Sequence, residues 1–389
     1  MGREGTTRVG IIGDGQLGMM LCQAAPALGL HTVMLAGDAR LPAAQCAQQV
    51  IVGAMDDLAA IDALVDASDV ITCEREDLPP ACIARLRGAA RDGALQCHPP
   101  LDNIELLQDK ARQKLFFADN RLATLPFVLS DGSPGKRREA QDLLGLPLVQ
   151  KALRGTFDGR GVQVLRDAPA LDAAWPGATL LEQHAGDFRE IAVLVARGRD
   201  GELAHFGPVD MRFETAHAVL DTVTAPSLQP EGIQRAAVSL ARAAVTALHG
   251  VGVYGVEMFV LAGGEVVINE ISPRVHNAGH YSLVACAASQ FEQHLRAVAG
   301  LPLADPALHS PAAMRNILAT PALQNAGVTE PAGCREHDSG AQLCWYGKSP
   351  ARAMRKLGHI TATGDSPAAA RERVDAAWEA VQARAESAA

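Results

Sequence analysis

The sequence predicts an α/β fold followed by an α+β fold, with a doubly wound parallel sheet in the N-terminal part and a small domain at the C-terminal end. Three observations lead to this prediction. The chain has 389 residues, which is long for one core and typical of two to three domains. Its first part alternates short apolar runs with amphipathic stretches. The middle part is richer in strand-like runs separated by glycine-bearing turns.

The N-terminal part, residues 1–100, has the rhythm of βαβ units. The apolar runs predicted as strands are 8–12, 31–35, 50–52 and 70–72. The stretch 15–28 is predicted as the first helix, and this alternation is typical of a parallel sheet covered by helices. The proline pairs at 79–80 and 99–100 interrupt the pattern, so we expect the first domain to end near residue 100.

The middle part, residues 101–300, mixes helices and antiparallel strands. One helix is predicted over 101–120 and a strongly apolar one over 236–248. The predicted strands are 146–151, 161–165, 179–183, 191–195, 254–261 and 265–271.

The C-terminal part, residues 301–389, begins where prolines break the pattern around 302–311. Short strands are predicted at 341–345 and 359–363. A final amphipathic helix is predicted over 366–385, because Ser366 suits an N-cap and the following proline suits the first helical position.

Composition and charge exclude several classes of protein. Hydrophobic residues make up 48% and charged residues 20% of the chain, which argues against global disorder. The net charge of −9 disfavours binding to nucleic acid or to an anionic membrane. No apolar run has the length of a signal peptide or of a membrane span, so we expect a cytoplasmic protein. The eight cysteines include no C-x-x-C pair, and we expect reduced, mostly buried thiols without a zinc site or a disulfide framework.

Two glycine-rich turns have the character of phosphate-binding loops. The turn 13–18, GDGQLG, lies between a predicted strand and a predicted helix, where backbone N–H groups can bind an anion. Asp38 follows at the spacing of a dinucleotide fingerprint, so NAD, FAD, another phosphate-bearing substrate and a plain turn all remain open. The second turn, 155–161, follows Lys151 and contains Arg160, so it can cover a phosphate between two strands.

A pair of glutamates predicts a metal site. If Gly263 and Gly264 form a two-residue hairpin loop, Glu257 lies directly opposite Glu270. Like charges at opposed positions are destabilising unless a cation lies between them, and Mg²⁺ or Mn²⁺ suits carboxylate oxygens. Asn269 can add a neutral oxygen. Solvated glutamates on an exposed face are the alternative, but the neighbouring residues are apolar.

Two further polar segments complete the candidate site. The loop 272–280, SPRVHNAGH, holds one arginine, two histidines and an asparagine, a set suited to binding a small carboxylate or bicarbonate. The segment 348–359 holds Lys348, Arg352, Arg355, Lys356 and His359 and no acidic residue, so it can dock a phosphate or serve as a basic, solvated face.

Along nearly its whole length the chain resembles the N5-carboxyaminoimidazole ribonucleotide synthetases, an ATP-grasp family of purine biosynthesis. The matching stretches are GQLG at 15–18, TCERE at 72–76, Lys151 with FDGRG at 157–161, EQ at 182–183, RE at 189–190, EMF at 257–259, NE at 269–270, PRVHNAGH at 273–280, QFE at 290–292, WYGK at 345–348 and RKLGH at 355–359. The resemblance implies an ATP-grasp fold with a biotin-carboxylase-like N-terminal domain, and a dimer.

The resemblance also implies a role for individual residues. The residues implied to bind ATP are Lys110, Lys151, Gly155, Phe157, Asp158, Gly159, Gly161, Glu182, Gln183, Glu190 and Asn269. Glu257 and Glu270 are implied to hold Mg²⁺ or Mn²⁺. Arg274, His276 and Asn277, with Lys151, are implied to be catalytic and to place bicarbonate. The residues implied to surround the ribonucleotide are Gln16, Leu17, Glu74, Asp158, Arg160, Arg274, Lys348 and Arg355.

The reaction implied is attack of bicarbonate on the γ-phosphate of ATP, followed by transfer of the carboxyl group to the amine of aminoimidazole ribonucleotide. Some positions differ from the family pattern: residues 212–218 lack its usual asparagine and histidine, and Phe157, Ala278, Met19 and Met354 replace tyrosine, serine, arginine and glycine. A paralogous ligase for another amine or acid is therefore an alternative. A dinucleotide-dependent oxidoreductase and a non-catalytic ATP-binding regulator are two others.

Overall fold

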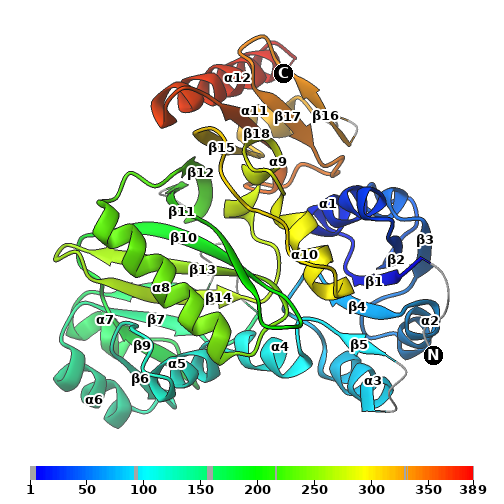
Figure 1. The fold of residues 1–389 in the computed structure, drawn as a ribbon. Helices are drawn as coiled ribbons and strands as arrows, with labels where there is room; N and C mark the ends of the chain where they lie inside the picture. Colours follow the sequence, from blue (N-terminus) through cyan, green and yellow to red (C-terminus); the bar gives the residue numbers. More distant parts are fainter. Residues whose placement is uncertain are drawn as a thin grey trace.

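The computed structural model describes residues 6–91, 95–155, 161–214, 217–327, 330 and 332–388. Figure 1 shows three sheets with helices packed on them, and the C-terminal helix lies far from the N-terminal sheet. Among the helices described, none is long and apolar enough to cross a membrane.

The N-terminal sheet has five parallel strands in the order β3-β2-β1-β4-β5, which confirms the predicted doubly wound α/β fold. The strands are β1 (Arg8–Ile12), β2 (His31–Ala36), β3 (Gln49–Val52), β4 (Val70–Cys73) and β5 (Gln96–Cys97). The helices of this part are α1 (Gln16–Ala24), α2 (Leu58–Ala67) and α3 (Pro80–Arg91), with the short 3-10 turns η1 (Ala25–Leu28) and η2 (Ala44–Cys46).

The rest of the chain forms two antiparallel sheets. A four-stranded sheet has the order β6-β9-β7-β8 and a nine-stranded sheet the order β14-β13-β10-β11-β12-β15-β18-β17-β16. The strands are β6 (Phe127–Ser130), β7 (Leu148–Ala152), β8 (Val162–Leu165), β9 (Thr179–Gln183), β10 (Phe188–Arg197), β11 (Leu203–Glu214), β12 (Val219–Ala225), β13 (Gly252–Leu261), β14 (Val266–Ser272), β15 (Ala312–Leu318), β16 (Gly333–Glu336), β17 (Gln342–Trp345) and β18 (Lys356–Thr363). The helices are α4 (Leu101–Leu107), α5 (Lys110–Asp119), α6 (Pro134–Leu144), α7 (Ala168–Asp172), α8 (Glu231–Ala247), α9 (Ser282–Ala285), α10 (Gln290–Ala299), α11 (Pro321–Asn325) and α12 (Pro367–Ala388), with the 3-10 turn η3 (Asn277–Gly279).

Alternation along β10 gives the nine-stranded sheet two different faces. Ile191, Val193 and Val195 belong to a core with the apolar residues of α8, whereas Ala192 and Leu194 belong to a core shared with α1 and α10. Glu190 therefore lies on the face opposite α8, near the end of β10. This face carries the candidate site.

The predicted helix over 101–120 is in fact two helices. Asp109 has extended backbone, and its side chain accepts hydrogen bonds from the backbone N–H groups of Ala111 and Arg112, so it caps the start of α5. The break places Lys110 at the first position of α5. Periodicity alone missed the break because the apolar residues continue across it.

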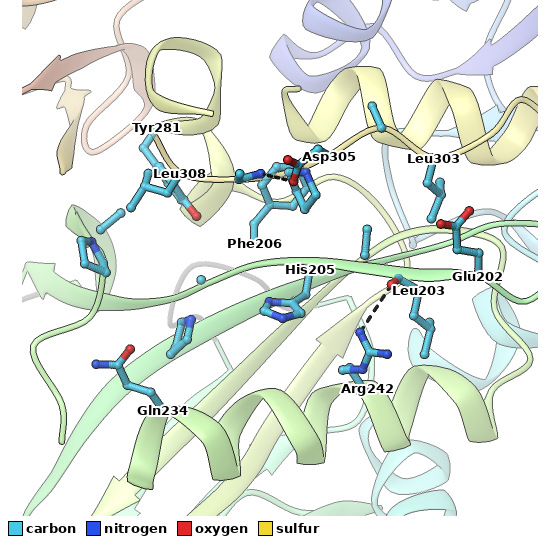
Figure 2. A pocket seen from close by; sticks show the side chains of 18 residues that line it. Glu202, Leu203, His205, Phe206, Gln234, Arg242, Tyr281, Leu303, Asp305 and Leu308 are labelled. Carbon is cyan, nitrogen blue, oxygen red and sulfur yellow. Dashed lines mark hydrogen bonds between the residues drawn. The ribbon is translucent and has the colours of Figure 1, made fainter. Parts of the chain in front are cut away.

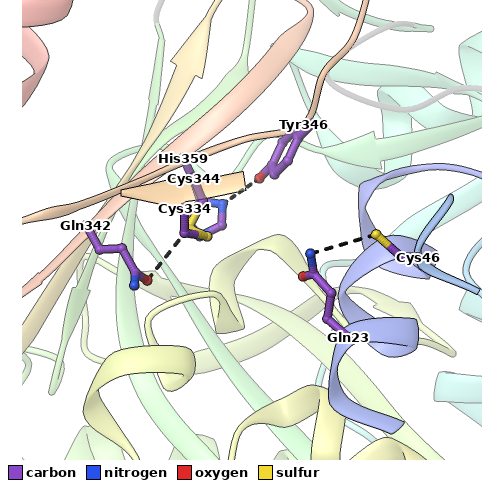
Figure 3. Close-up of a disulfide and its surroundings, with 7 residues drawn as sticks. All are labelled: Gln23, Cys46, Cys334, Gln342, Cys344, Tyr346 and His359. Atoms are coloured by element: carbon purple, nitrogen blue, oxygen red, sulfur yellow. Dashed lines mark hydrogen bonds between the residues drawn. A yellow bond between two sulfur atoms is a disulfide. The ribbon is translucent and has the colours of Figure 1, made fainter. Parts of the chain in front are cut away.

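The expectation of reduced thiols is wrong for one pair of cysteines. Cys334 on β16 and Cys344 on β17 form a disulfide, and their Cα atoms are 4.0 Å apart (Figure 3). The two residues are direct partners in the antiparallel ladder, so the hairpin brings together thiols that the sequence separates by ten positions. The other six cysteines are free.

Candidate functional site

Three glutamates gather on the face of the nine-stranded sheet opposite α8. Glu257 and Glu270 are directly opposed across β13 and β14, as the sequence predicted. Glu190 lies on β10 opposite Phe259, on the same face. Burial, and then the negative charges of Glu257 and Glu270, raise the pKa of Glu190 to about 8. Burial and the two neighbouring carboxylates therefore disfavour the ionised form of Glu190.

The loop of this hairpin differs from the prediction. The backbone N–H of Leu261 donates to the carbonyl of Glu265 at 2.9 Å, so the loop has three residues rather than two. A bulge then shifts the register between Glu257 and Met258. The two shifts cancel, and for this reason Glu257 and Glu270 face each other although the expected two-residue loop is wrong.

Lys110 and Lys151 approach the cluster from other elements. The Nζ of Lys110 lies 2.6 Å from Glu270 Oε2, and this charge lowers the pKa of Glu270 to about 2. The Nζ of Lys151, on β7, donates to Asn269 Oδ1 at 3.0 Å. The structure thus brings together six of the residues predicted for nucleotide and metal binding: Lys110, Lys151, Glu190, Glu257, Asn269 and Glu270.

Glu182 is buried between two lysines. Its Oε2 lies 2.6 Å from the Nζ of Lys151, and its Oε1 contacts Lys114. Burial alone would raise the pKa of Glu182, but the two positive charges outweigh it and lower that pKa. Both oxygens of Glu182 therefore face lysines, whereas Gln183 beside it is exposed.

The loop after β14 extends from the acidic cluster toward the N-terminal sheet. Arg274 forms an ion pair with Glu76, with Nη2 3.0 Å from Oε1, and Glu76 raises the pKa of Arg274 against the effect of burial. The Nε2 of His276 lies 2.9 Å from Glu257 Oε1, and its Nδ1 accepts the backbone N–H of Ala278 at 3.3 Å. This network assigns the proton to Nε2, so His276 donates to Glu257.

Asn277 continues this loop as a buried residue. Its amide forms two hydrogen bonds with the amide of Asn316 on β15, at 3.1 and 2.7 Å. The predicted catalytic residues Arg274, His276 and Asn277 are thus each held by a partner.

On the N-terminal side, Glu74 occupies the glycine turn. Its carboxylate accepts the backbone N–H groups of Gly15 at 2.5 Å and Gly18 at 2.7 Å, and burial raises its pKa. A dinucleotide pyrophosphate would need these same N–H groups. Asp38, the expected ribose ligand of such a cofactor, is paired with Arg40 at 2.6 Å. This arrangement argues against the oxidoreductase alternative.

The same turn meets the C-terminal basic segment. The Nζ of Lys348 donates to Gln16 Oε1 at 2.5 Å, and Leu17 beside Gln16 is buried. Arg355 instead donates to the carbonyls of Ser349 and Pro350, at 3.2 and 2.9 Å. Of the residues predicted for the ribonucleotide, Gln16, Glu74 and Lys348 therefore lie together, with Arg355 on the same segment as Lys348.

Part of the predicted site lies outside the described residues. Phe157, Asp158, Gly159 and Arg160 belong to this group. Gly155 and Gly161 border the segment, and the carbonyl of Gly161 accepts the backbone N–H of Ala152 at 2.9 Å.

A cavity of about 700 Å³ lies away from these residues, between β11, α8 and the segment 303–308 (Figure 2). Its lining includes His205, Arg242 and Asp305, and none of the residues predicted for the site. It therefore does not form part of the candidate site.

Sequence reasoning missed four residues that hold the site: Glu76, Lys114, Gln290 and Asn316. Glu76 and Gln290 stand inside stretches that matched the family, but the match does not show what their side chains contact. Lys114 lies four positions after Lys110 in α5 and is almost fully buried, so a lysine at helical spacing on a buried face was an available signal. Asn316 carries no local signal in the sequence.

Three family models match the chain. A ribonucleotide synthetase preATP-grasp domain matches residues 6–108, an ATP-grasp domain residues 115–291, and a phosphoribosylaminoimidazole carboxylase C-terminal domain residues 312–373.

Relatives match over nearly the whole chain. The N5-carboxyaminoimidazole ribonucleotide synthase of Brucella melitensis is 38% identical, covering 92% of this chain and 96% of its own, and that of Synechococcus elongatus is 38% identical, covering 91% and 88%. The crystal structure of the Thermotoga maritima synthetase has a TM-score of 0.83 at 35% identity, covering 96% and 98%. The Aspergillus clavatus enzyme, solved with ADP and 5-aminoimidazole ribonucleotide, has a TM-score of 0.84 at 28% identity, covering 97% and 99%. The chain belongs to the N5-carboxyaminoimidazole ribonucleotide synthase family of ATP-grasp enzymes.

Proposed function

We propose that this enzyme carboxylates 5-aminoimidazole ribonucleotide, using ATP and bicarbonate and releasing ADP and phosphate. The observation that carries the proposal is the juxtaposition of the acidic cluster of Glu190, Glu257 and Glu270 with Lys110 and Lys151. Opposed carboxylates beside lysines suit a metal-bound triphosphate, because both the cation and the phosphate oxygens find partners there.

The donor set fits a divalent cation. Glu257 and Glu270 face each other, and Asn269 adds an amide oxygen. Within the described ranges, no group of three or more His, Cys, Asp or Glu side chains is arranged to hold a metal alone, so phosphate oxygens of the nucleotide would complete the shell. Mg²⁺ or Mn²⁺ bound there would neutralise charge on the phosphates and polarise the γ-phosphate.

The protein's own residues would then position the reactants. Lys110 and Lys151 would neutralise the phosphate oxygens, while Arg274, His276 and Asn277 would orient bicarbonate for in-line attack on the γ-phosphate. The oxygen of bicarbonate forms a bond to phosphorus as the bond to ADP breaks, giving carboxyphosphate. The amine of the ribonucleotide then takes the carboxyl group, and phosphate leaves.

The ribonucleotide would lie between the N-terminal sheet and the basic segment. Glu74 accepts a hydrogen bond from the backbone of Gly15, next to Gln16 in the turn 15–18, and Lys348 donates to the side chain of Gln16. We assign Lys348 and Arg355 to its phosphate. The roles of Asp158 and Arg160 on this side, and of Phe157 and Gly159 at ATP, stay predictions of the sequence. So do the division at residues 100 and 300, the cytoplasmic location and the dimer.

The test is ADP release by the 389-residue chain in saturating ATP, Mg²⁺ and bicarbonate, with and without 5-aminoimidazole ribonucleotide. Strong stimulation by the ribonucleotide supports the proposal. Stimulation by a different amine, with none by the ribonucleotide, would favour the paralogous ligase instead.

A further inference from the structure

Gln290 binds both peptide groups of His276. Its Oε1 accepts the backbone N–H of His276 at 2.8 Å, and its Nε2 donates to the carbonyl of His276 at 2.7 Å. Gln290 is fully buried at the first position of α10. One side chain therefore fixes the backbone that carries the imidazole, much as a neighbouring strand would.

The side chain of Gln290 is closely packed against Gly279. A Cβ atom added to Gly279 would lie 2.6 Å from Gln290 Oε1, so only glycine leaves room for this side chain. Ser282 Oγ accepts the backbone N–H of Gln290 at 3.0 Å and donates to the carbonyl of Gly279 at 2.6 Å. Gln290, which holds the backbone of His276, is therefore itself held by Ser282 and packed against Gly279.

Asn316, in the C-terminal part of the chain, holds the side chain of Asn277 rather than its backbone. The two amides exchange hydrogen bonds, and Asn316 Nδ2 also donates to the carbonyl of Leu220 at 2.8 Å. Asn316 is fully buried on β15, so its own amide is held by the nine-stranded sheet.

We propose that Gln290 and Asn316 are positioning residues that hold His276 and Asn277 against the activated carboxyl group. The inference rests on the proposed function. According to this inference, Gln290 and Asn316 determine where bicarbonate is placed and how efficiently its carboxyl group is transferred to the amine. If the two amides are lost, His276 and Asn277 gain freedom, and carboxyphosphate is hydrolysed more often before transfer.

The main test compares Gln290→Met with Gln293→Met. Gln293 lies on the same helix, is equally buried, and also bridges both peptide groups of one residue, Ala304, whose N–H it accepts at 2.9 Å. Steady-state assays measure the KM for bicarbonate and the ratio of ADP released to ribonucleotide carboxylated. A 1 Å misplacement can cost about 10²-fold, so we expect Gln290→Met to raise the KM for bicarbonate about tenfold or more and to raise the ratio severalfold. Gln293→Met should keep both at wild-type values, even if less of the protein is folded.

Asn316→Leu provides a second, independent variant, with the same expected rise in KM and in the ratio. If the two residues had only a structural role, their loss would reduce the fraction of active enzyme and hence the apparent kcat, but it would change neither the KM for bicarbonate nor the ratio of ADP to carboxylated ribonucleotide. Wild-type values of both quantities in folded Gln290→Met and Asn316→Leu would therefore overturn the inference. It would also be overturned if both variants failed to fold while Gln293→Met folded. If the wild-type chain is inactive with the ribonucleotide, the proposed function is overturned and the inference with it. If the wild type is active but both variants keep its KM for bicarbonate and its ratio of ADP to carboxylated ribonucleotide, only the inference is overturned.

Discussion

Replacing Gly255 by alanine tests the placement of His276 with a single methyl group. The added Cβ would lie 2.7 Å from both Cβ and Cγ of His276. Carbon atoms in contact lie about 3.5–4.0 Å apart, so the imidazole must move by about 1 Å. Its Nε2 is now 2.9 Å from Glu257 Oε1, and such a movement takes this pair beyond hydrogen-bond distance.

The expected loss is in rate more than in stability. A misplacement of about 1 Å costs about 10²-fold, so we expect kcat for ADP release to fall by about that factor. The free energy of unfolding should fall by no more than about 2.5 kcal/mol, because overpacking costs about 1–3 kcal/mol and alanine regains about 0.5–1 kcal/mol over glycine in a strand. Steady-state kinetics and urea unfolding measure the two quantities.

Gly263→Ala is the matched control. Gly263 lies in the loop of the same hairpin, and a Cβ added there meets no atom within 4 Å. It should keep wild-type kcat. A Gly255→Ala enzyme with wild-type kcat would refute the assignment of His276 to the reaction.

Four further outcomes are expected. Glu270→Gln should abolish ADP formation, because it removes one of the two opposed carboxylates, while circular dichroism shows an intact fold; normal turnover would contradict the metal assignment. Lys348→Ala should raise the KM for the ribonucleotide about 10–150-fold, since hydrogen bonds to charged groups contribute about 1.5–3 kcal/mol, and an unchanged KM would contradict its role. Met354 has a φ of 59°, a conformation that favours glycine, so Met354→Gly should increase the free energy of unfolding by about 1 kcal/mol in urea titrations, and no gain would argue against strain there. Burial lowers the pKa of His98 to about 4 and the pKa of His294 and of His359 to about 3, so between pH 6.5 and 5.5 the unfolded chain gains protons at these histidines that the folded chain does not, and each histidine lowers the free energy of unfolding by about 1 kcal/mol. Glu190, with its pKa raised to about 8, binds its proton in the folded state instead and offsets about 1 kcal/mol. The free energy of unfolding should therefore fall by about 2 kcal/mol from pH 6.5 to 5.5 in urea titrations, and a flat profile would contradict this.

Local patterns predicted the fold well because each element carries its own signal. Strands such as β1 and β2 and the helix α8 follow from apolar periodicity that a short window of sequence contains. The break at Asp109 was missed because a capping side chain, rather than a change in periodicity, marks the start of the second helix.

The candidate site was predictable where pairing is local. Glu257 and Glu270 face each other across one hairpin, although a bulge had to compensate for the longer loop. Arg274 with Glu76 and Asn277 with Asn316 join distant parts of the chain, and no local pattern encodes such contacts. The Cys334–Cys344 disulfide depends on the register of a hairpin that includes β16, a strand absent from the prediction.

The central claim is that this enzyme moves a carboxyl group from bicarbonate to the amine of aminoimidazole ribonucleotide at the expense of ATP. ¹³C NMR of a reaction with ¹³C-labelled bicarbonate, Mg²⁺, ATP and the ribonucleotide tests it directly. We predict a carbamate resonance that appears only when ATP, the ribonucleotide and the wild-type chain are all present. ADP formation without any labelled carbamate on the ribonucleotide would contradict the account.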